Sequence, residues 1–394
     1  MKKLTIIKLF YPLSLTIICI LRVIRPFIRI RLTAINESRI GLIARDVHIN
    51  RIKSLDWSLN HFRRDLVIYV TPNRNSANKF LSQMFRRETR FVTGNFGASF
   101  YHAASKIKGM TITTEHVPDF DGLLSKHSIL PKFTASELHD GNKFLESVGC
   151  NRDKFVCLLV RDNAYIKDRF PSKIDGYTSY RNSDISRYVE AAEALGDLGF
   201  HVFRMGSNSE NAMESSHPKV IDYSKNGMRT EFLDIFLSAH CTFFISTGSG
   251  LDEVPKIFRR PITYVNIQPL GSDLNYTDVL LYPKILRDAY SHAPLTLREI
   301  AERNLQFAYD TKLYSLANVT IDDMKSEEIL EVTLETVNRV NGSWTPTAQY
   351  IKSDEALRNI FNSVPELRMR PEINKVPSGK LAACFLERYP NFLD

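Results

Sequence analysis

Cysteines are few in this sequence, and their arrangement excludes two kinds of site. The five are Cys19, Cys150, Cys157, Cys241 and Cys384, with no Cys-x-x-Cys pair among them. A disulfide framework needs an even set, and a zinc knuckle needs closely spaced pairs. The ten histidines are dispersed, with none at metal-ligand spacing. We therefore expect a reducing, cytosolic setting and no metal or other cofactor.

A long apolar run is also missing. The charge-free stretch from Leu9 to Leu21 covers 13 residues, whereas a membrane-spanning helix needs about 20. No small-x-small cleavage site follows it, so a signal peptide is not indicated. We interpret residues 1–28 as a membrane-associating segment that lies in the membrane interface. A spanning helix with a cytosolic body and a helix that caps a domain are the alternatives.

Acidic residues are absent from the first 31 positions. These positions contain seven Lys and Arg residues, or +7 of the net charge of +8, which leaves +1 for the other 363 residues. A nucleic-acid-binding surface is poorly supported, and we expect no nucleic-acid partner. Cations beside apolar side chains suit an anionic membrane surface. We expect a peripheral or monotopic protein at the cytoplasmic face of the inner membrane.

The body of the chain alternates between strand and helix patterns. At 394 residues it is long enough for two domains. The apolar run from Phe155 to Val160 is typical of a parallel strand buried on both faces. Strands over 200–205, 241–246 and 262–266 follow, with helices between them. This spacing predicts a doubly wound parallel sheet.

The first half of the chain shows the same alternation less clearly. Strands are predicted over 29–35 and 65–71, whereas residues 90–130 show no clear period and are assigned to loops. The predicted fold class is therefore α/β, with a Rossmann-like sheet in each of two domains. The domains are expected over 29–150 and 151–340, with a helical or irregular extension over 341–394.

Two arginines follow strands of the second domain. Ligands of an open parallel sheet bind beyond the carboxyl ends of its strands, where Arg161 and Arg204 are predicted to lie. A guanidinium pairs bidentately with phosphate and keeps its charge. We expect both arginines to bind a diphosphate; ion pairs with Asp162, Asp184 or Glu253 are the alternative.

A glycine-rich loop follows the strand over 241–246 and begins a helix. Its residues are Thr247, Gly248, Ser249 and Gly250. Glycines let a backbone approach a diphosphate closely, and a helix N-terminus offers N–H groups to it. A tight strand-to-helix turn without a ligand is the alternative. Because the loop and both arginines are predicted at one sheet edge, we favour a shared binding site.

Several segments together resemble a known family. They are Tyr180-Arg-Asn-Ser-Asp184 with Tyr188, Gly199 to Gly206, Val160-Arg-Asp162 with Tyr165, Ser246 to Gly250, and Pro283-Lys284. In these segments the sequence resembles a family of bacterial glycosyltransferases from surface-polysaccharide clusters, and the similarity covers most of residues 30–340 in order. It implies a GT-B-like fold, with two Rossmann-like doubly wound domains facing a cleft, and a nucleotide-sugar donor. Where the family pattern has a histidine after Arg39-Ile-Gly41, this sequence has Leu42.

The resemblance implies a division of roles between the domains. The second domain would bind a nucleotide-diphosphate sugar through Arg161, Arg204 and the loop over 247–250, and the first would present a glycan or lipid-linked acceptor. The arginines would neutralise the departing diphosphate. Asp46 and His48 are the candidates for the catalytic base that activates the acceptor hydroxyl. An exposed helix face is the alternative for these two residues.

Three further interpretations remain to be weighed. Asp119-Phe120-Asp121 has the Asp-x-Asp spacing of a glycosyltransferase metal motif, but it does not follow a buried strand, so we interpret it as a surface turn. A non-catalytic nucleotide-sugar-binding or assembly protein is the main rival function. A nucleotide-sugar epimerase is disfavoured because there is no Gly-x-Gly-x-x-Gly near the start and no Tyr-x-x-x-Lys pair.

Overall fold

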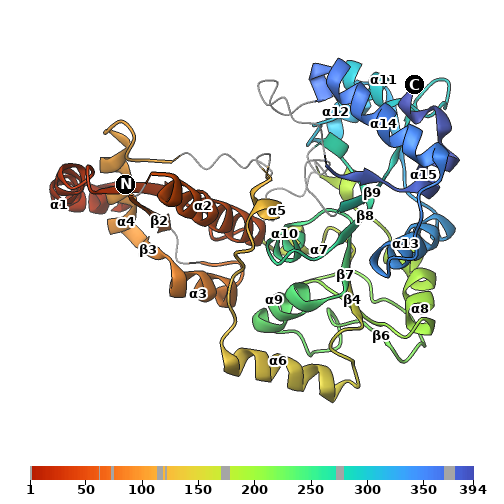
Figure 1. Cartoon of the computed structure of the whole chain (residues 1–394), viewed down its shortest axis with the longest axis horizontal. Helices are drawn as coiled ribbons and strands as arrows, with labels where there is room; N and C mark the ends of the chain where they lie inside the picture. The colour runs from red at the N-terminus through yellow and green to blue at the C-terminus, as the bar shows by residue number, and fades with distance from the viewer. Residues whose placement is uncertain are drawn as a thin grey trace. The chain divides into compact units, whose positions relative to one another are not determined.

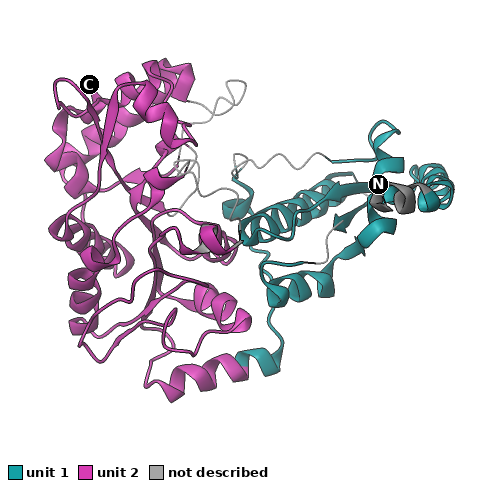
Figure 2. Ribbon diagram, turned by 180° about the vertical axis from the view of Figure 1, so that it is seen from behind, with its two compact units in different colours: residues 1–138 teal, residues 139–394 magenta. Residues whose placement is uncertain are grey.

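The chain forms two compact α/β units. The computed structural model describes residues 2–61, 63–71, 75–112, 119, 122–169, 178–271, 279–367 and 378–394 (Figure 1). Residues 1–138 form unit 1 and residues 139–394 form unit 2 (Figure 2). The division lies within helix α6 (Ala135–Ser147), before the boundary expected near residue 150. Each unit has a parallel sheet of its own, so the predicted α/β class is confirmed.

Unit 1 is built on a short parallel sheet. Its strands β1 (Ile28–Ala34), β2 (Arg64–Thr71) and β3 (Arg90–Thr93) lie side by side in that order. On the other edge of β1, Leu32 forms a parallel bridge with Thr111. The chain therefore adds strands on one side of β1 and then returns to its other side, which is Rossmann-like winding.

Helices cover both faces of this sheet. Helices α1 (Lys2–Val23) and α4 (Gly94–Ser105) pack on the face that contains Val70 of β2. Successive strand residues point to opposite faces, so Tyr69 points the other way, and its hydroxyl donates to the Val47 carbonyl of α2 (Ile40–His61) at 3.0 Å. Helix α3 (Lys79–Glu88) follows β2. The cluster under α1 and α4 consists of Ile18, Ile30, Leu32, Val70, Phe100, Ala103, Ala104 and Met110.

The expectation of loops over 90–130 is wrong. This region contains β3, α4 and the short helix α5 (Leu123–Lys126). The buried face of α4 includes Gly97, Ser99, Ala103 and Ala104. Side chains this small add little to an apolar periodicity, so the apolar spacing that predicts a helix is weak in this segment.

The N-terminal helix is an integral part of unit 1. The hydroxyl of Ser14 in α1 donates to that of Ser99 in α4 at 3.1 Å, and both side chains are fully buried. Ile18 belongs to the core cluster. Within the described part of the chain, no helix combines the length and apolarity that crossing a membrane requires. One face of α1 thus completes a domain core, as the capping-helix alternative predicts.

Unit 2 is built on a seven-stranded sheet in which every neighbouring pair is parallel. The strand order is β12-β9-β8-β7-β4-β5-β6. The chain starts at the central strand β4, moves outward through β5 and β6, and then returns to the other side of β4 through β7, β8 and β9. This is the strand order of the Rossmann fold, and the predicted doubly wound sheet is confirmed. The bounds are β4 (Phe155–Leu159), β5 (His201–Arg204), β6 (Val220–Ile221), β7 (Phe243–Ser246), β8 (Ile262–Ile267), β9 (Val279–Pro283) and β12 (Lys380–Leu381).

Helices connect these strands and surround the sheet. Their bounds are α7 (Ala164–Arg169), α8 (Val189–Asp197), α9 (Glu231–His240), α10 (Glu253–Ile257), α11 (Leu297–Glu302), α12 (Thr311–Leu316), α13 (Ser326–Val340), α14 (Ala348–Ser363) and α15 (Ala383–Arg388). An antiparallel pair, β10 (Ile285–Asp288) with β11 (Val319–Asp322), lies outside the main sheet. All residues of β4, β5, β7, β8 and β9 are buried. Strands buried on both faces are apolar along their length, so most of these strands could be predicted from the sequence.

The C-terminal segment is more ordered than expected. Residues 341–394 contain α14 and α15, and β12 pairs with β9 at the edge of the sheet. The ring of Phe385 packs edge-on against Tyr282 of β9, with 5.1 Å between centroids. This segment therefore belongs to unit 2. A two-residue strand is too short to produce a readable alternation in the sequence.

Candidate functional site

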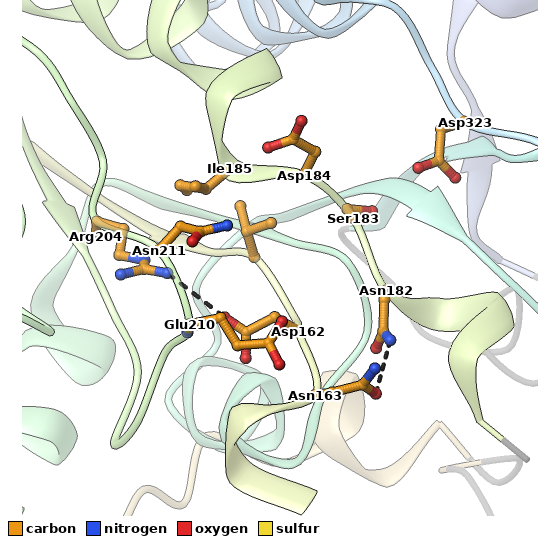
Figure 3. A pocket seen from close by; sticks show the side chains of 11 residues that line it. Asp162, Asn163, Asn182, Ser183, Asp184, Ile185, Arg204, Glu210, Asn211 and Asp323 are labelled. Atoms are coloured by element: carbon orange, nitrogen blue, oxygen red, sulfur yellow. Dashed lines mark hydrogen bonds and ion pairs between the residues drawn. The ribbon is translucent and has the colours of Figure 1, made fainter. Parts of the chain in front are cut away.

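A polar pocket lies at the carboxyl ends of β4 and β5 in unit 2 (Figure 3). Its volume is about 300 Å³. It is lined by Val160, Asp162, Asn163, Asn182, Ser183, Asp184, Ile185, Arg204, Glu210, Asn211 and Asp323. Open parallel sheets hold their ligands at this edge, next to the point where the winding reverses. The pocket is therefore the candidate functional site.

Arg204 brings a buried cation to this pocket. It is the last residue of β5, and only 1% of its side chain is exposed. Its Nη1 donates to Ser209 Oγ at 2.8 Å and lies 3.2 Å from Asp222 Oδ1, and its Nη2 lies 4.0 Å from Asp162 Oδ2. The ion-pair alternative is thus confirmed for Arg204 with Asp162, and the Nε of the guanidinium is a buried donor without a partner among the described residues.

Arg161 lies beside the pocket rather than among its lining residues. Its guanidinium donates to the carbonyl and to the hydroxyl of Thr178, at 3.1 and 2.8 Å. Its backbone N–H donates to Thr247 Oγ1 at 2.9 Å, and the Thr247 N–H donates to the Leu159 carbonyl at 3.1 Å. The turns that follow β4 and β7 are therefore joined. Two of the predicted binding elements meet where the winding reverses.

The glycine loop uses two of its amides internally. The Gly248 N–H donates to Ser246 Oγ at 3.0 Å, and the Ser249 N–H donates to Asp252 Oδ2 at 2.6 Å. Gly250 begins a three-residue 3₁₀ turn, and α10, which follows, has five residues. These hydrogen bonds favour the tight-turn alternative for Gly248 and Ser249. The Ser249–Asp252 capping box was readable in the sequence as a signal of this arrangement.

Gly248 also fixes the shape of this loop. Its φ is +82°, and a Cβ at this position would lie 2.6 Å from Ile267 Cδ1. A side chain is therefore excluded both by the backbone conformation and by space. The Gly248 carbonyl accepts from Arg181 Nη2 at 2.5 Å. Arg181 thus adds a further cation beside the loop.

Two carboxylates of the pocket hold its backbone in place. Asp162 accepts from the N–H groups of Ala164 and Glu210, at 2.9 and 2.8 Å. Asp184 caps the helical turn that follows it, Ile185–Tyr188, by accepting from the Ser186 N–H at 3.0 Å. This hydrogen bond lowers the pKa of Asp184 below its usual value. In the sequence these acids were expected only as possible partners of the arginines, although Asp184 stands in the segment that carries the family resemblance.

The other two pocket carboxylates pair with lysines. Lys284 Nζ lies 2.6 Å from Asp323 Oδ1 and donates to the Asn182 carbonyl at 2.7 Å. Burial lowers the pKa of the Lys284 ammonium, and Asp323 opposes this shift. Lys167 Nζ lies 2.5 Å from Glu210 Oε1. The lining itself carries four carboxylates and one arginine, and Lys284 and Lys167 offset two of the carboxylates from outside it. Carboxylates and amides on such a wall suit a ligand rich in hydroxyl groups.

The candidate bases both lie on α2 in unit 1. Asp46 is 7% exposed, and its Oδ1 lies 3.1 Å from Arg45 Nε. His48 is fully buried, with its ring 6.4 Å from that of Phe85, measured between centroids. The exposed-face alternative is therefore wrong for both residues. Leu42, which stands where the family pattern has a histidine, is partly exposed on the same helix.

Asp119 has a structural role that the sequence did not reveal. Its Oδ1 and Oδ2 accept from the N–H groups of Leu123 and Leu124, at 2.9 and 2.7 Å, and the side chain is buried. The interpretation as a surface turn is wrong for Asp119, because the carboxylate caps α5. Asp121 lies outside the described residues. Across those residues, no group of three or more His, Cys, Asp or Glu side chains could hold a metal ion.

Comparison with known proteins finds similarity only among solved structures. No protein-family model and no curated protein matches the sequence. A glycosyl transferase family 9 structure from Veillonella parvula DSM 2008 is 10% identical, with a TM-score of 0.46, over 79% of this chain and 97% of that chain. The ADP-heptose lps heptosyltransferase II of E. coli is 10% identical, with a TM-score of 0.39, over 65% and 91%. The iron-containing dodecameric glycosyltransferase TibC of enterotoxigenic E. coli H10407 is 12% identical, with a TM-score of 0.39, over 81% and 78%. At these values the likeness concerns the fold alone.

Proposed function

We propose that this protein is a glycosyltransferase that moves a sugar from a nucleotide-diphosphate sugar to a glycan or lipid-linked acceptor in bacterial surface-polysaccharide synthesis. The observation that carries the proposal is the pocket at the carboxyl ends of β4 and β5, with the buried Arg204 guanidinium on its wall. Rossmann-type sheets bind nucleotides at this edge. The segment from Tyr180 to Asp184, which carries the family resemblance, supplies three of the lining residues.

The charges around the pocket suggest how a donor lies. Carboxylates and amides on the lining suit the hydroxyl groups of a ribose or a sugar. The diphosphate needs cations. Arg204 supplies one in the pocket and Arg181 one beside the glycine loop, and Arg161, whose backbone N–H bonds to Thr247 of that loop, supplies a third. Negative charge grows on the diphosphate as the glycosidic bond breaks, so fixed cations stabilise the transition state more than the ground state. We expect transfer to proceed without a divalent metal.

The acceptor side is assigned to unit 1. The acceptor hydroxyl must lose a proton to a base as it attacks. Asp46 and His48 remain the candidates, and Asp46 is the stronger because His48 is fully enclosed in the core of the unit. The proposal also places the enzyme at the cytoplasmic face of the inner membrane, attached peripherally, where a lipid-linked acceptor would be available.

A non-catalytic nucleotide-sugar-binding or assembly protein is the second candidate. It is favoured by the burial of His48 and by the internal hydrogen bonds of the Gly248 and Ser249 amides. Both candidates predict binding of a nucleotide-diphosphate sugar, but only the first predicts transfer. Incubating the protein with each donor that binds, together with membrane lipid extract, and following loss of the donor sugar by mass spectrometry separates them. Binding without any transfer or hydrolysis favours the second candidate.

A further inference from the structure

Helix α1 has a buried face and an exposed face, and both are apolar. The buried face packs on α4 and the sheet of unit 1 through Tyr11, Ser14, Ile17, Ile18, Leu21 and Ile24. These positions recur every three or four residues, as expected of one side of a helix. The helix is therefore held in place by the core of unit 1, and its orientation is fixed by protein packing.

The other face presents large apolar side chains to solvent. Leu9 is 76% exposed, Leu13 55%, Ile20 57%, Val23 75% and Phe27, just beyond the helix, 78%. Their spacing places Leu9, Leu13, Ile20 and Val23 in one stripe along α1. We call these five residues the outer stripe. A large exposed apolar patch of this kind is typical of a surface that binds a membrane or another protein.

The exposed side of the helix also has few polar groups that are free to bind water. Thr16 is exposed between Leu13 and Ile20, and its hydroxyl donates to the Pro12 carbonyl at 3.0 Å. Between Leu9 and Leu21, a fully described range, no charged side chain interrupts the helix. The surface therefore offers little to water.

Unit 1 is strongly basic, which the near-neutral charge of the whole body conceals. Residues 1–138 contain 22 Lys and Arg and nine Asp and Glu, a formal charge of +13, whereas residues 139–394 contain 30 and 35, a charge of −5. Several of the nine acids already have cationic partners in unit 1. The pairs are Glu37 with Arg86, Asp46 with Arg45, Asp65 with both Arg29 and Arg31, Glu88 with Arg51, and Glu137 with Arg87.

A basic rim lies at the C-terminal end of α1. The Arg25 guanidinium donates to the carbonyls of Lys108 and Gly109, at 3.4 and 3.1 Å, which holds the exposed Lys106 and Lys108 beside this end of the helix. Arg22 is exposed one turn earlier. Arg29 and Arg31, counted with the N-terminal cations in the sequence, instead bond to Asp65. We call Arg22, Arg25, Lys106 and Lys108 the basic rim.

We propose that the outer stripe of α1 lies in the surface of an anionic bilayer, with its apolar side chains among the acyl chains and the basic rim on the headgroups. This inference rests on the peripheral attachment in the proposed function and specifies which face makes it. A second copy of the chain is disfavoured as the occupant because two units of charge +13 repel each other, whereas an anionic leaflet attracts them. Because α4 covers the inner face, α1 lies along the membrane surface and does not cross the bilayer.

The test uses the full-length protein and vesicles of phosphatidylcholine with or without phosphatidylglycerol. Flotation should recover the wild type with the anionic vesicles. Leu13→Asp and Ile20→Asp should each weaken this partitioning about tenfold, because each removes an apolar side chain that would enter the membrane and adds a charge that anionic lipid repels. Leu316→Asp, at a residue of α12 in unit 2 that is 79% exposed, is the matched control and should bind as the wild type does. All three residues are exposed, so the melting temperature should stay within about 1 °C of the wild type.

A second pair of variants tests the basic rim. Arg22→Glu and Lys106→Glu should lower binding to anionic vesicles and leave the weak binding to neutral ones unchanged. Wild-type binding by Leu13→Asp and Ile20→Asp would overturn the proposal. So would a concentration-dependent dimer, measured by sedimentation, that these substitutions abolish, because the stripe would then belong to a second copy.

Affinity for nucleotide-diphosphate sugars, measured on the same variants, keeps this proposal separate from the proposed function. Variants that no longer bind vesicles but keep wild-type donor affinity support membrane binding by the outer stripe. A wild type that binds anionic vesicles and no donor also supports membrane binding by the outer stripe, and it contradicts the proposed glycosyltransferase function instead.

Discussion

Replacing Arg204 with alanine tests the site through two separate quantities. The guanidinium is 1% exposed and faces Asp222 at 3.2 Å and Asp162 at 4.0 Å, so its removal leaves two carboxylates without their cation. Breaking a buried ion pair costs roughly 3–5 kcal/mol, and the lower end applies because both carboxylates are partly exposed. A domain of this size loses roughly 2–4 °C per kcal/mol, so the melting temperature of unit 2 should fall by about 6–12 °C. Because Arg204 is buried, we expect its loss to lower stability as well as affinity.

The same substitution should weaken donor binding. The Arg204 guanidinium lines the pocket and can make a charge-assisted hydrogen bond to a phosphate, worth about 1.5–3 kcal/mol. Its loss corresponds to roughly a tenfold to hundredfold lower affinity by titration calorimetry. Turnover should fall further than affinity, because charge builds on the diphosphate during transfer.

Three variants separate structure from binding. Asp222→Asn removes the closer ion-pair partner and should lower the melting temperature with little effect on donor affinity. Arg204→Lys keeps the charge without the planar fork and should recover more stability than affinity. Arg152→Ala removes an exposed pair with Glu146 and should change neither quantity. If Arg204→Ala lowers the melting temperature and leaves donor affinity at the wild-type value, Arg204 is a structural residue and the proposed site is wrong.

Three further predictions follow from the packing and the caps. Deleting residues 1–28 should yield an aggregated or unfolded unit 1 by circular dichroism, because Ser14 and Ile18 belong to its core; a folded, soluble product contradicts the integral role of α1. Donor binding should survive EDTA, and its loss with rescue by Mn²⁺ would indicate a metal site that we have not assigned. The Ser186 N–H lowers the pKa of Asp184 in the folded state, so this cap stabilises the fold above the usual carboxyl pKa and weakens as pH falls through the lowered value. Asp184→Ala should cost about 0.5–2 kcal/mol at neutral pH by chemical denaturation, and a difference from the wild type that persists undiminished in acid would refute the linkage.

The sheet of unit 2 was largely predictable because its strands are buried on both faces. The run from Phe155 to Val160 contains β4, and the glycine loop was placed correctly after β7. Their adjacency follows from the winding rule for parallel sheets, and the hydrogen bond from the Arg161 N–H to Thr247 shows the two turns in contact. The sequence therefore indicated the edge of the sheet at which the pocket lies.

Other features depend on partners distant in sequence. Asp222, which follows β6, reaches Arg204 only because β6 lies beside β5. No local sequence pattern predicts that these two strands are neighbours. The role of α1 was hidden because it packs on small residues of α4, such as Ser99, that leave no apolar signature. The summed charge of the body concealed a basic unit 1 and an acidic unit 2, since the division between the units was not placed at residue 138.

Binding of nucleotide-diphosphate sugars to the wild-type chain is the most direct test of the central claim. Titration calorimetry against a panel of uridine, guanosine, adenosine and cytidine donors, with Arg204→Ala as the paired variant, measures it. We predict that at least one donor binds the wild type and that the variant binds it about tenfold to a hundredfold more weakly. If no donor binds, or if the same donor binds both proteins equally, the pocket beyond β4 and β5 is not a nucleotide-sugar site.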